Sequence, residues 1–166
     1  MRARSGRPLP GFGPEYPQQD EIEIIGNFGG QVMATVGQLM TSNLLSVGEG
    51  ESIQDAAKVM HARRIGSLLV KNDDEFTGII TETDVVKAVA EQPGNIEGLT
   101  VEGVMSSPII TVERKMSPHY ARDLMADRKI RHLAVIDQEA IIGIVSVRDL
   151  LAYFKTVSKE LAEDKG

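Results

Sequence analysis

The sequence predicts an α+β fold in which two β-α-β-β-α units pack against each other about a pseudo-twofold axis. Three observations support this fold class. The chain repeats itself at a constant separation, and both copies show the same order of strand and helix patterns. Each copy alone is too short to bury the apolar surface that a stable domain needs, so we expect the two copies to share an interface.

The internal repeat runs without a gap over most of the chain. Val36 corresponds to Val101, a separation of 65 positions (101 − 36 = 65). Matches at one constant separation over so many residues are not expected by chance, so the chain contains an internal duplication. We assign residues 1–33 to an N-terminal extension, 34–92 to the first unit, 99–157 to the second and 158–166 to a C-terminal tail. Other pairs at the same separation are Met40 and Met105, Val47 and Val112, Ala56 and Ala121, Met60 and Met125, Leu68 and Leu133, Gly78 and Gly143, and Asp84 and Asp149.

The N-terminal extension does not share the repeat. Residues 1–20 are rich in Pro, Gly and Arg and have no apolar period, so we expect them to stay flexible. Residues 21–25 (EIEII) alternate between acidic and apolar side chains, which is typical of a short edge strand or of a segment that packs on a partner. Met33 stands just before the first unit and is an alternative start of translation.

Each unit begins with a short extended run, residues 44–47 in the first and 109–112 in the second, followed by an amphipathic helix. Ser52 is a suitable N-cap for the first of these helices, whose apolar positions recur at helical spacing. Ser117 is the corresponding cap in the second unit. Pro118 then occupies the first helical position, where proline is tolerated.

Two apolar strands and a second helix complete each unit. Polar turns at residues 71–75 and 137–139 predict that the two strands of each unit form a hairpin. The closing helices are expected at residues 82–91 and from residue 147 into the tail. The turn-rich segment 92–100 joins the two units.

The composition excludes several classes of function. Apolar residues make up 42% and charged residues 25%, which is ordinary for a globular protein. Aromatic residues make up only 4% and the net charge is −6, so a nucleic-acid partner is disfavoured. The absence of Cys excludes disulfides and thiolate metal sites. No apolar run reaches the roughly 18 residues of a membrane span, and no secretory signal is evident, so we expect a cytoplasmic protein.

The segment GIITETD (residues 78–84) recurs as GIVSVRD (residues 143–149) after the last strand of each unit. A hydroxyl and a carboxylate lie three residues apart in both copies, a spacing that fits a helical capping box. The same residues also fit a nucleotide site. An ionised carboxylate offers two acceptor oxygens to a ribose diol, and the free N–H groups at a helix start favour a phosphate. The glycine of each copy leaves room for a closely passing backbone.

Two copies of M-[ST]-S, each followed by the β-α-β-β-α pattern and by G-h-h-[ST]-x-x-D, resemble a tandem pair of CBS domains, also called a Bateman module. The resemblance covers about residues 36–154, and RHLAVID at residues 131–137 is close to the family's usual start of the second strand. Members of this family mostly bind AMP, ADP, ATP, S-adenosylmethionine or sometimes NADH, and thereby regulate enzymes, channels or partner proteins. The resemblance implies a regulatory module that is not an enzyme and needs no cofactor.

In related modules the motif of one unit works with the first strand and with the start of the second strand of the other unit. The resemblance therefore implies two clefts. We expect Arg131 and His132 to make the first cleft the better phosphate site, because the second has Gly66 and Ser67 at these positions. The alternatives are a solvated surface charge for Arg131 and a hydrogen-bonded strand-edge residue for His132. The first cleft would use Thr81, Thr83, Asp84, Ile109, Ile110, Arg131 and His132, and the second Ser146, Arg148, Asp149, Leu44, Leu45, Gly66 and Ser67.

Three functions stay open. The leading one is an adenine-nucleotide sensor that acts on an unidentified effector protein. The others are a structural dimerisation module with empty clefts and a nucleic-acid-associated regulator that uses the Arg-rich extension. We also expect a homodimer, because two amphipathic helices in each unit carry more apolar surface than one pseudo-twofold interface covers. The three His residues are too scattered for a metal site, and no known catalytic motif is present.

Overall fold

The structure is a computed structural model that describes residues 34–92 and 94–163. The expectations for residues 1–33 lie outside the described residues. They are a flexible extension, a short strand at residues 21–25 and a start of translation at Met33.

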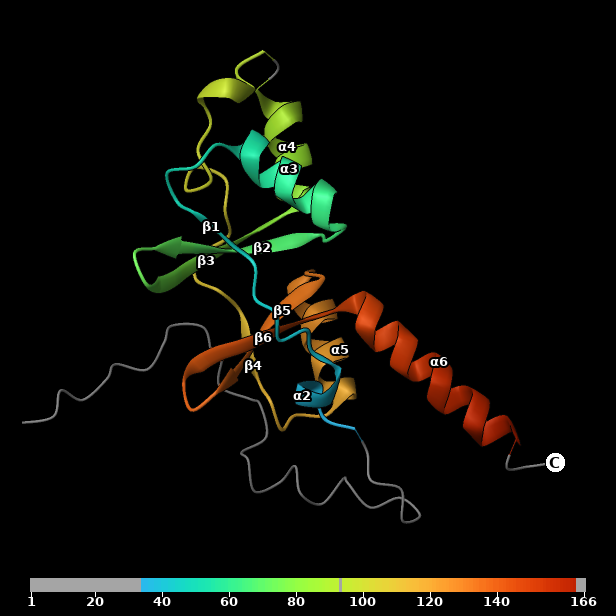
Figure 1. Cartoon of the computed structure of the whole chain (residues 1–166). Coiled ribbons are helices and arrows are strands. Elements are labelled where there is room, and N and C mark those ends of the chain that lie inside the picture. Colours follow the sequence, from blue (N-terminus) through green and yellow to red (C-terminus); the bar gives the residue numbers. More distant parts are fainter. Residues whose placement is uncertain (1–33, 93, 164–166) are drawn as a thin grey trace, which may run out of the picture. The chain divides into compact units, whose positions relative to one another are not determined.

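The described chain contains two three-stranded sheets of identical topology, which confirms the predicted α+β repeat (Figure 1). In each sheet the short first strand pairs in parallel with the second, and the second pairs antiparallel with the third. The first repeat consists of β1 (Ser46–Gly48), α3 (Ile53–Arg63), β2 (Ser67–Asn72), β3 (Glu75–Thr81) and α4 (Glu82–Glu91). The second consists of β4 (Thr111–Glu113), α5 (Pro118–Arg128), β5 (His132–Asp137), β6 (Ala140–Ser146) and α6 (Val147–Glu163). A short α2 (Val36–Leu39) precedes the first repeat, and a 3-10 turn, η1 (Ile96–Gly98), lies between the repeats.

The first helix of each repeat begins after the serine that the sequence predicts as its cap. Ser52 Oγ accepts the N–H of Asp55 at 3.1 Å, and Ser117 Oγ accepts that of Tyr120 at 3.1 Å. Both helices end at a residue with left-handed backbone, Arg64 or Lys129, each with φ of 55°. The N–H of this residue bonds to carbonyl groups of the last turn, which ends the helix and directs the chain into the next strand.

The two hairpins share one register. Ser67 lies opposite Thr81 in the first, His132 lies opposite Ser146 in the second, and a bulge interrupts both strand pairs at the same point. Each motif hydroxyl residue therefore ends a strand beside the start of the repeat's second strand. After the second hairpin, α6 continues as expected into the C-terminal tail, as far as Glu163.

Each repeat has its own apolar core, and each core contains a residue from the other repeat. Val101 belongs to the core of the first repeat, and Val36 belongs to the core of the second. Both side chains are fully buried. The units of packing therefore differ from the sequence units 34–92 and 99–157, because the residues that begin each unit pack on the opposite repeat.

Backbone hydrogen bonds hold these exchanged segments in place. The N–H of Val36 donates to the carbonyl of Met116 at 2.8 Å, and the N–H of Val101 donates to the carbonyl of Glu51 at 2.9 Å. Donors and acceptors correspond at the repeat separation of 65 residues (101 − 36 = 116 − 51 = 65). The exchange is therefore reciprocal, as a pseudo-twofold relation between the repeats requires.

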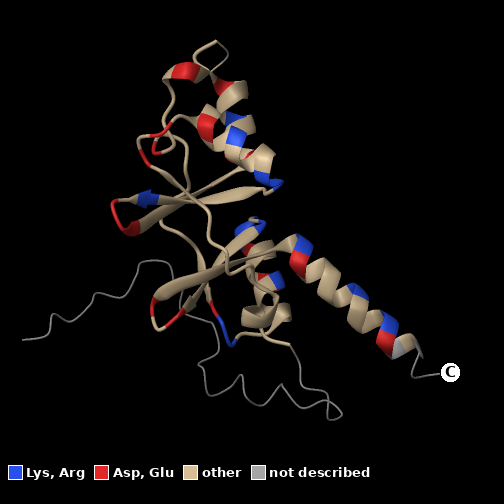
Figure 2. Cartoon of the chain, in the orientation of Figure 1, with Lys and Arg blue, Asp and Glu red and all other residues tan. Residues whose placement is uncertain are grey.

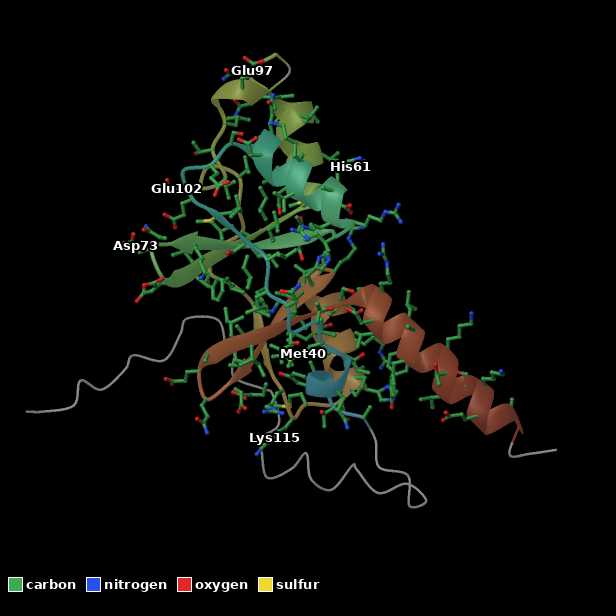
Figure 3. All side chains as sticks on the ribbon, in the orientation of Figure 1. Met40, His61, Asp73, Glu97, Glu102 and Lys115 are labelled. Atoms are coloured by element: carbon green, nitrogen blue, oxygen red, sulfur yellow. The ribbon has the colours of Figure 1, made fainter. Side chains whose placement is uncertain are left out.

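Gly78 and Gly143 make room for the exchanged segments. A Cβ at Gly78 would overlap the sulfur of Met105, and a Cβ at Gly143 would overlap the sulfur of Met40. The sequence predicted a closely passing backbone, and at Gly78 the carbonyl oxygen of Ser106 lies 3.1 Å from the Cβ position. The nearest atoms, however, are methionine side chains. Figure 3 shows Met40, which belongs to the first sequence unit, among the elements of the second repeat.

Candidate functional site

The repeated motif forms the same capping box at the start of α4 and of α6. Asp84 Oδ2 accepts the N–H of Thr81 at 2.8 Å and its Oγ–H at 2.6 Å. Asp149 Oδ2 accepts the corresponding bonds from Ser146 at 2.8 Å and 2.6 Å. The N–H of each aspartate in turn points to the hydroxyl oxygen, at 3.4 Å. The structure therefore confirms that the motif caps a helix in both repeats.

The capping box leaves one oxygen of each carboxylate available. All the bonds above use Oδ2, and within residues 34–92 and 94–163 nothing donates to Oδ1 of Asp84 or Asp149. Both residues are half-buried. An ionised carboxylate whose orientation is fixed through one oxygen can accept a ligand hydroxyl through the other. Helix capping and ligand binding are therefore compatible, and the cap orients the carboxylate.

The chain crosses from the first repeat to the second beside the Asp84 motif. Ser106 exchanges backbone hydrogen bonds with Ile79 of β3, and Ser107 Oγ donates to the carbonyl of Thr77 at 2.8 Å. Farther along the same segment, the carbonyl of Ile110 accepts the N–H of Ala134 in β5 at 3.2 Å. Ile109 and Ile110 thus lie where the chain passes from β3 to β5.

The Asp149 motif has the equivalent crossing. Thr41 exchanges backbone hydrogen bonds with Ile144 of β6, and the carbonyl of Leu45 accepts the N–H of Leu69 in β2 at 3.1 Å. Leu44 and Leu45 therefore correspond in position to Ile109 and Ile110. We call the two arrangements the Asp84 site (Thr81, Thr83, Asp84, Ile109, Ile110 and Arg131) and the Asp149 site (Ser146, Arg148, Asp149, Leu44, Leu45 and Gly66).

Arg131 contacts the first motif. Its Nη2 donates a hydrogen bond to Thr83 Oγ1 in the first turn of α4. Arg131 directly precedes β5 of the second repeat, so this bond joins the two repeats and brings a guanidinium to the Asp84 site. Figure 2 shows further basic positions where α3 ends and where α6 begins. The basic position at the start of α6 is that of Arg148.

His132 lies where the two repeats meet. Its Cε1 and Nε2 are both 3.4 Å from the Cβ position of Gly66, and Glu82 Oε2 is 3.3 Å from the same point. Burial lowers the pKa of His132, and the charge of Arg131 lowers the pKa further, whereas Glu82 and Asp149 act in the opposite direction. His132 therefore becomes protonated at a lower pH than a free imidazole does.

Ser67 and His132, the first residues of β2 and β5, are both half-buried. Each faces the motif hydroxyl of its own repeat across the hairpin. His132, which the sequence assigns to the first cleft, also reaches Gly66 of the other cleft. His132 therefore has a residue of the second cleft as a neighbour, in addition to its expected place in the first.

Glu82 is a residue of this region that the sequence analysis missed. It is the first residue of α4, and its N–H donates to the carbonyl of Gly66 at 3.1 Å. A glutamate in the first helical turn is common because it interacts favourably with the helix N-terminus, so its type alone does not indicate a site. The available signal was a difference between the copies, since the equivalent position holds Val147.

Two further properties concern only the part of the chain that the structure describes. In it, no group of three or more His, Cys, Asp or Glu side chains could hold a metal ion. No helix in this part is long and apolar enough to span a lipid bilayer.

The CBS domain family model matches this chain twice, over residues 36–91 and 101–156. Each match contains one capping motif, and together the matches cover most of the chain. The protein belongs to the CBS-domain family and carries two CBS domains in tandem.

Curated relatives share the pair of domains at moderate identity. An uncharacterized protein of Methanopyrus kandleri, MK0525, is 36% identical over 119 residues, which are 70% of this chain and 61% of that protein. The Bacillus subtilis CBS domain-containing protein YhcV is 31% identical over 118 residues, which are 71% of this chain and 84% of that protein. A homoserine O-acetyltransferase of Methanococcoides burtonii is 33% identical over 128 residues, but the match covers only 26% of that enzyme.

Solved structures of CBS proteins superpose on this chain. The CBS-domain protein ATU1752 from Agrobacterium tumefaciens has a TM-score of 0.71 and 30% identity, over 76% of this chain and 98% of that one. The CBS domain pair of protein MJ0100, in complex with 5′-methylthioadenosine and S-adenosyl-L-methionine, has a TM-score of 0.66 and 25% identity, over 75% and 98%. A hexameric CBS-CP12 protein from bloom-forming cyanobacteria has a TM-score of 0.68 and 30% identity, over 74% and 73%.

Proposed function

We propose that this CBS pair is a regulatory sensor of adenosine-containing ligands, with the adenine nucleotides AMP, ADP and ATP as its preferred ligands. S-adenosylmethionine and NADH belong to the same chemical class. The sensor acts on a separate effector protein rather than through a reaction of its own. The cytoplasm is its expected location.

The observation that carries this proposal is the available Oδ1 of Asp84 and of Asp149. Each carboxylate is fixed by its capping box beside a crossing segment that carries two apolar residues. A carboxylate oxygen suits a ribose hydroxyl, and the apolar pair suits the face of an adenine ring. The similar CBS pair of MJ0100 binds two adenosine compounds, which supports the same ligand class for this chain.

A purely structural dimerisation module is the second candidate, because the capping boxes explain the motif without any ligand. A nucleic-acid regulator is the third. It depends on arginines of the N-terminal extension, which lie outside the described residues.

Calorimetric titration of AMP, ATP, S-adenosylmethionine and NADH into the parent protein tests the proposal. We expect micromolar binding of an adenine nucleotide, roughly 8 kcal/mol. The double variant Asp84→Ala, Asp149→Ala should lose about 1.5 to 3 kcal/mol of binding free energy at each site. If this variant binds AMP as tightly as the parent, the motifs are helix caps only.

The Asp→Ala changes also remove a helix cap, so loss of stability must be separated from loss of binding. Ser117→Ala is a matched control because it removes the cap of α5 outside both sites. It should cost about 0.5 to 2 kcal/mol of stability and leave nucleotide affinity unchanged. Asp84→Asn and Asp149→Asn form a second pair, because an amide oxygen can still accept the capping N–H while the negative charge is lost.

The proposal includes a homodimer formed through α4 and α6. Val86 on α4 is 67% exposed and Leu151 on α6 is 63% exposed. These two residues correspond in the repeat (151 − 86 = 65). Beside Leu151, an apolar hollow of about 400 Å³ lies between α5 and α6, lined by Met125, Leu150 and Phe154 among others. A second copy would cover the exposed side chains of both repeats together.

A further inference from the structure

The two copies of the motif differ in charge at the residue that directly follows the motif hydroxyl. Glu82 follows Thr81, and its equivalent after Ser146 is Val147 (147 − 82 = 65). Each is the first residue of a helix, and its N–H donates to the carbonyl of the residue just before the repeat's second strand. The backbone arrangement is therefore the same in both repeats, and only the first repeat carries a carboxylate at this position.

The carboxylate of Glu82 lies beside Gly66, a member of the Asp149 site. Its Oε2 is 3.3 Å from the position that a Cβ of Gly66 would occupy. At the Asp84 site the equivalent position is that of Arg131 (131 − 66 = 65), whose side chain reaches the first motif. Where the side chain of Arg131 leaves the backbone toward the Asp84 site, the Asp149 site has a carboxylate instead.

The negative charge of Glu82 is available to a ligand. Glu82 is exposed and makes no ion pair within residues 34–92 and 94–163. His132 lies close by, with its Cε1 and Nε2 each 3.4 Å from the same Cβ position. Because burial lowers the pKa of His132, its imidazole is mostly neutral at pH 7 and does not cancel the charge of Glu82.

The balance of charge therefore differs between the two sites. The Asp84 site has one carboxylate and one guanidinium, those of Asp84 and Arg131. The Asp149 site has the guanidinium of Arg148 against two carboxylates, those of Asp149 and Glu82. An excess of negative charge repels an anionic ligand and attracts a cationic one, most strongly at low ionic strength.

We propose that Glu82 makes the Asp149 site selective for an adenosine ligand whose 5′ substituent carries positive charge. S-adenosylmethionine has a sulfonium at the 5′ carbon and an ammonium on the same substituent, whereas AMP has an anionic phosphate there. This inference rests on the proposed adenosine-sensing function and narrows it at one of the two sites. It is compatible with the expectation that the first cleft is the better phosphate site. The difference, however, comes from a charge that the second cleft has and not only from side chains that it lacks.

The test compares three adenosine compounds at one site at a time. In an Asp84→Asn background only the Asp149 site retains its motif carboxylate, and calorimetry should show tighter binding of S-adenosylmethionine than of AMP. Adding Glu82→Gln removes the charge and keeps the shape. It should weaken S-adenosylmethionine about twofold to fivefold and strengthen AMP by a similar factor. 5′-Methylthioadenosine has an uncharged 5′ substituent and should change least, and added salt should reduce the difference between the ligands.

Further variants separate the charge of Glu82 from its place in the helix. Glu91→Gln removes the same charge from the last turn of α4 and should leave the ratio of the S-adenosylmethionine and AMP affinities unchanged. Glu82→Val introduces the residue of the equivalent position 147 and should act like Glu82→Gln. In an Asp149→Asn background, where only the Asp84 site retains its carboxylate, Glu82→Gln should change the ratio less. Circular dichroism shows whether each variant is folded.

The outcomes separate this inference from the proposed function. If Glu82→Gln changes all three affinities by the same factor, or changes none of them, Glu82 does not select the ligand and the inference is overturned. An Asp149 site that binds AMP more tightly than S-adenosylmethionine overturns it as well and leaves adenosine sensing in place. A protein that binds none of the three compounds in either background overturns both.

Discussion

At the residue scale, Asp84 and Asp149 use different oxygens of one carboxylate for different purposes. Oδ2 caps the helix, and Oδ1 is the oxygen that we assign to a ribose hydroxyl. The cap is worth about 0.5 to 2 kcal/mol, and it also fixes the direction in which Oδ1 points. A substitution of either aspartate therefore changes both the helix cap and the proposed ligand contact. Stability and affinity have to be measured on the same variants.

His132 should make the stability of the ligand-free protein depend on pH. Burial, the largest cause, lowers its pKa in the folded state below the ordinary value of about 6.5. Below pH 6.5 the unfolded chain therefore binds more protons than the folded chain, and the free energy of unfolding falls as the pH falls through this window. His132→Ser introduces the residue of the equivalent position 67. This variant should lose less stability than the parent between pH 7.5 and pH 5.

Urea unfolding at several pH values measures this difference. His61→Gln, at an exposed position of α3, is the matched control for the loss of an imidazole away from Gly66. Equal pH dependence in the parent and in His132→Ser would show that His132 does not favour its neutral form in the folded protein.

At the scale of the elements, the sequence predicted what local signals determine. Ser52 and Ser117 marked the starts of α3 and α5, and polar turns marked both hairpins. The exchange of Val36 and Val101 between the two cores was not predicted. A repeat shows that two positions are equivalent, but not which copy's core each of them enters. That choice depends on tertiary packing against β3 and β6.

The same limit applies to the candidate site. Sequence reasoning proposed Arg131 for the first motif, and the structure brings it to Thr83. It assigned Arg148 to the second cleft, and the structure shows this residue exposed in the first turn of α6. The position of His132 against Gly66 also follows from the pseudo-twofold packing and has no local signal.

The contact between Met40 and Gly143 should be a measurable part of the exchange. Gly143→Ala places a methyl group on the Met40 side chain, whose Cγ lies 2.8 Å from the Cβ position. We expect this overlap to destabilise the protein by about 1 to 3 kcal/mol. Met40→Ala removes the overlapping atoms, so the double variant should be more stable than the sum of the two single effects predicts.

Gly50→Ala is the control for this double-mutant cycle. Nothing lies within 4 Å of a Cβ at Gly50, so this change should be neutral or slightly stabilising. Denaturant unfolding of the four proteins of the cycle gives the coupling energy. Strict additivity of the Gly143→Ala and Met40→Ala effects would mean that the two residues do not share the proposed contact.

At the scale of the whole molecule, the duplication has a consequence for assembly. The reciprocal exchange of segments already buries one surface of each repeat against the other. Two of the apolar side chains that stay exposed are related by the repeat, since Val86 on α4 corresponds to Leu151 on α6 (151 − 86 = 65). A second copy of this chain presents the same two helices, α4 and α6. It can therefore cover both exposed helices with one symmetric interface.

Light scattering of the parent protein at micromolar concentration should therefore give the mass of a dimer. Val86→Lys and Leu151→Lys each place a charge on an exposed apolar position, at 67% and 63% exposure in the single chain. Both variants should shift the equilibrium toward the monomer, because a lysine buried in an apolar interface loses its hydration without gaining a partner. Asn72→Lys, at the exposed end of β2, introduces the same charge away from α4 and α6 and should remain dimeric. A strictly monomeric parent contradicts the homodimer. A dimer that only one of the two lysines disrupts would show that the interface uses a single repeat and does not follow the pseudo-symmetry.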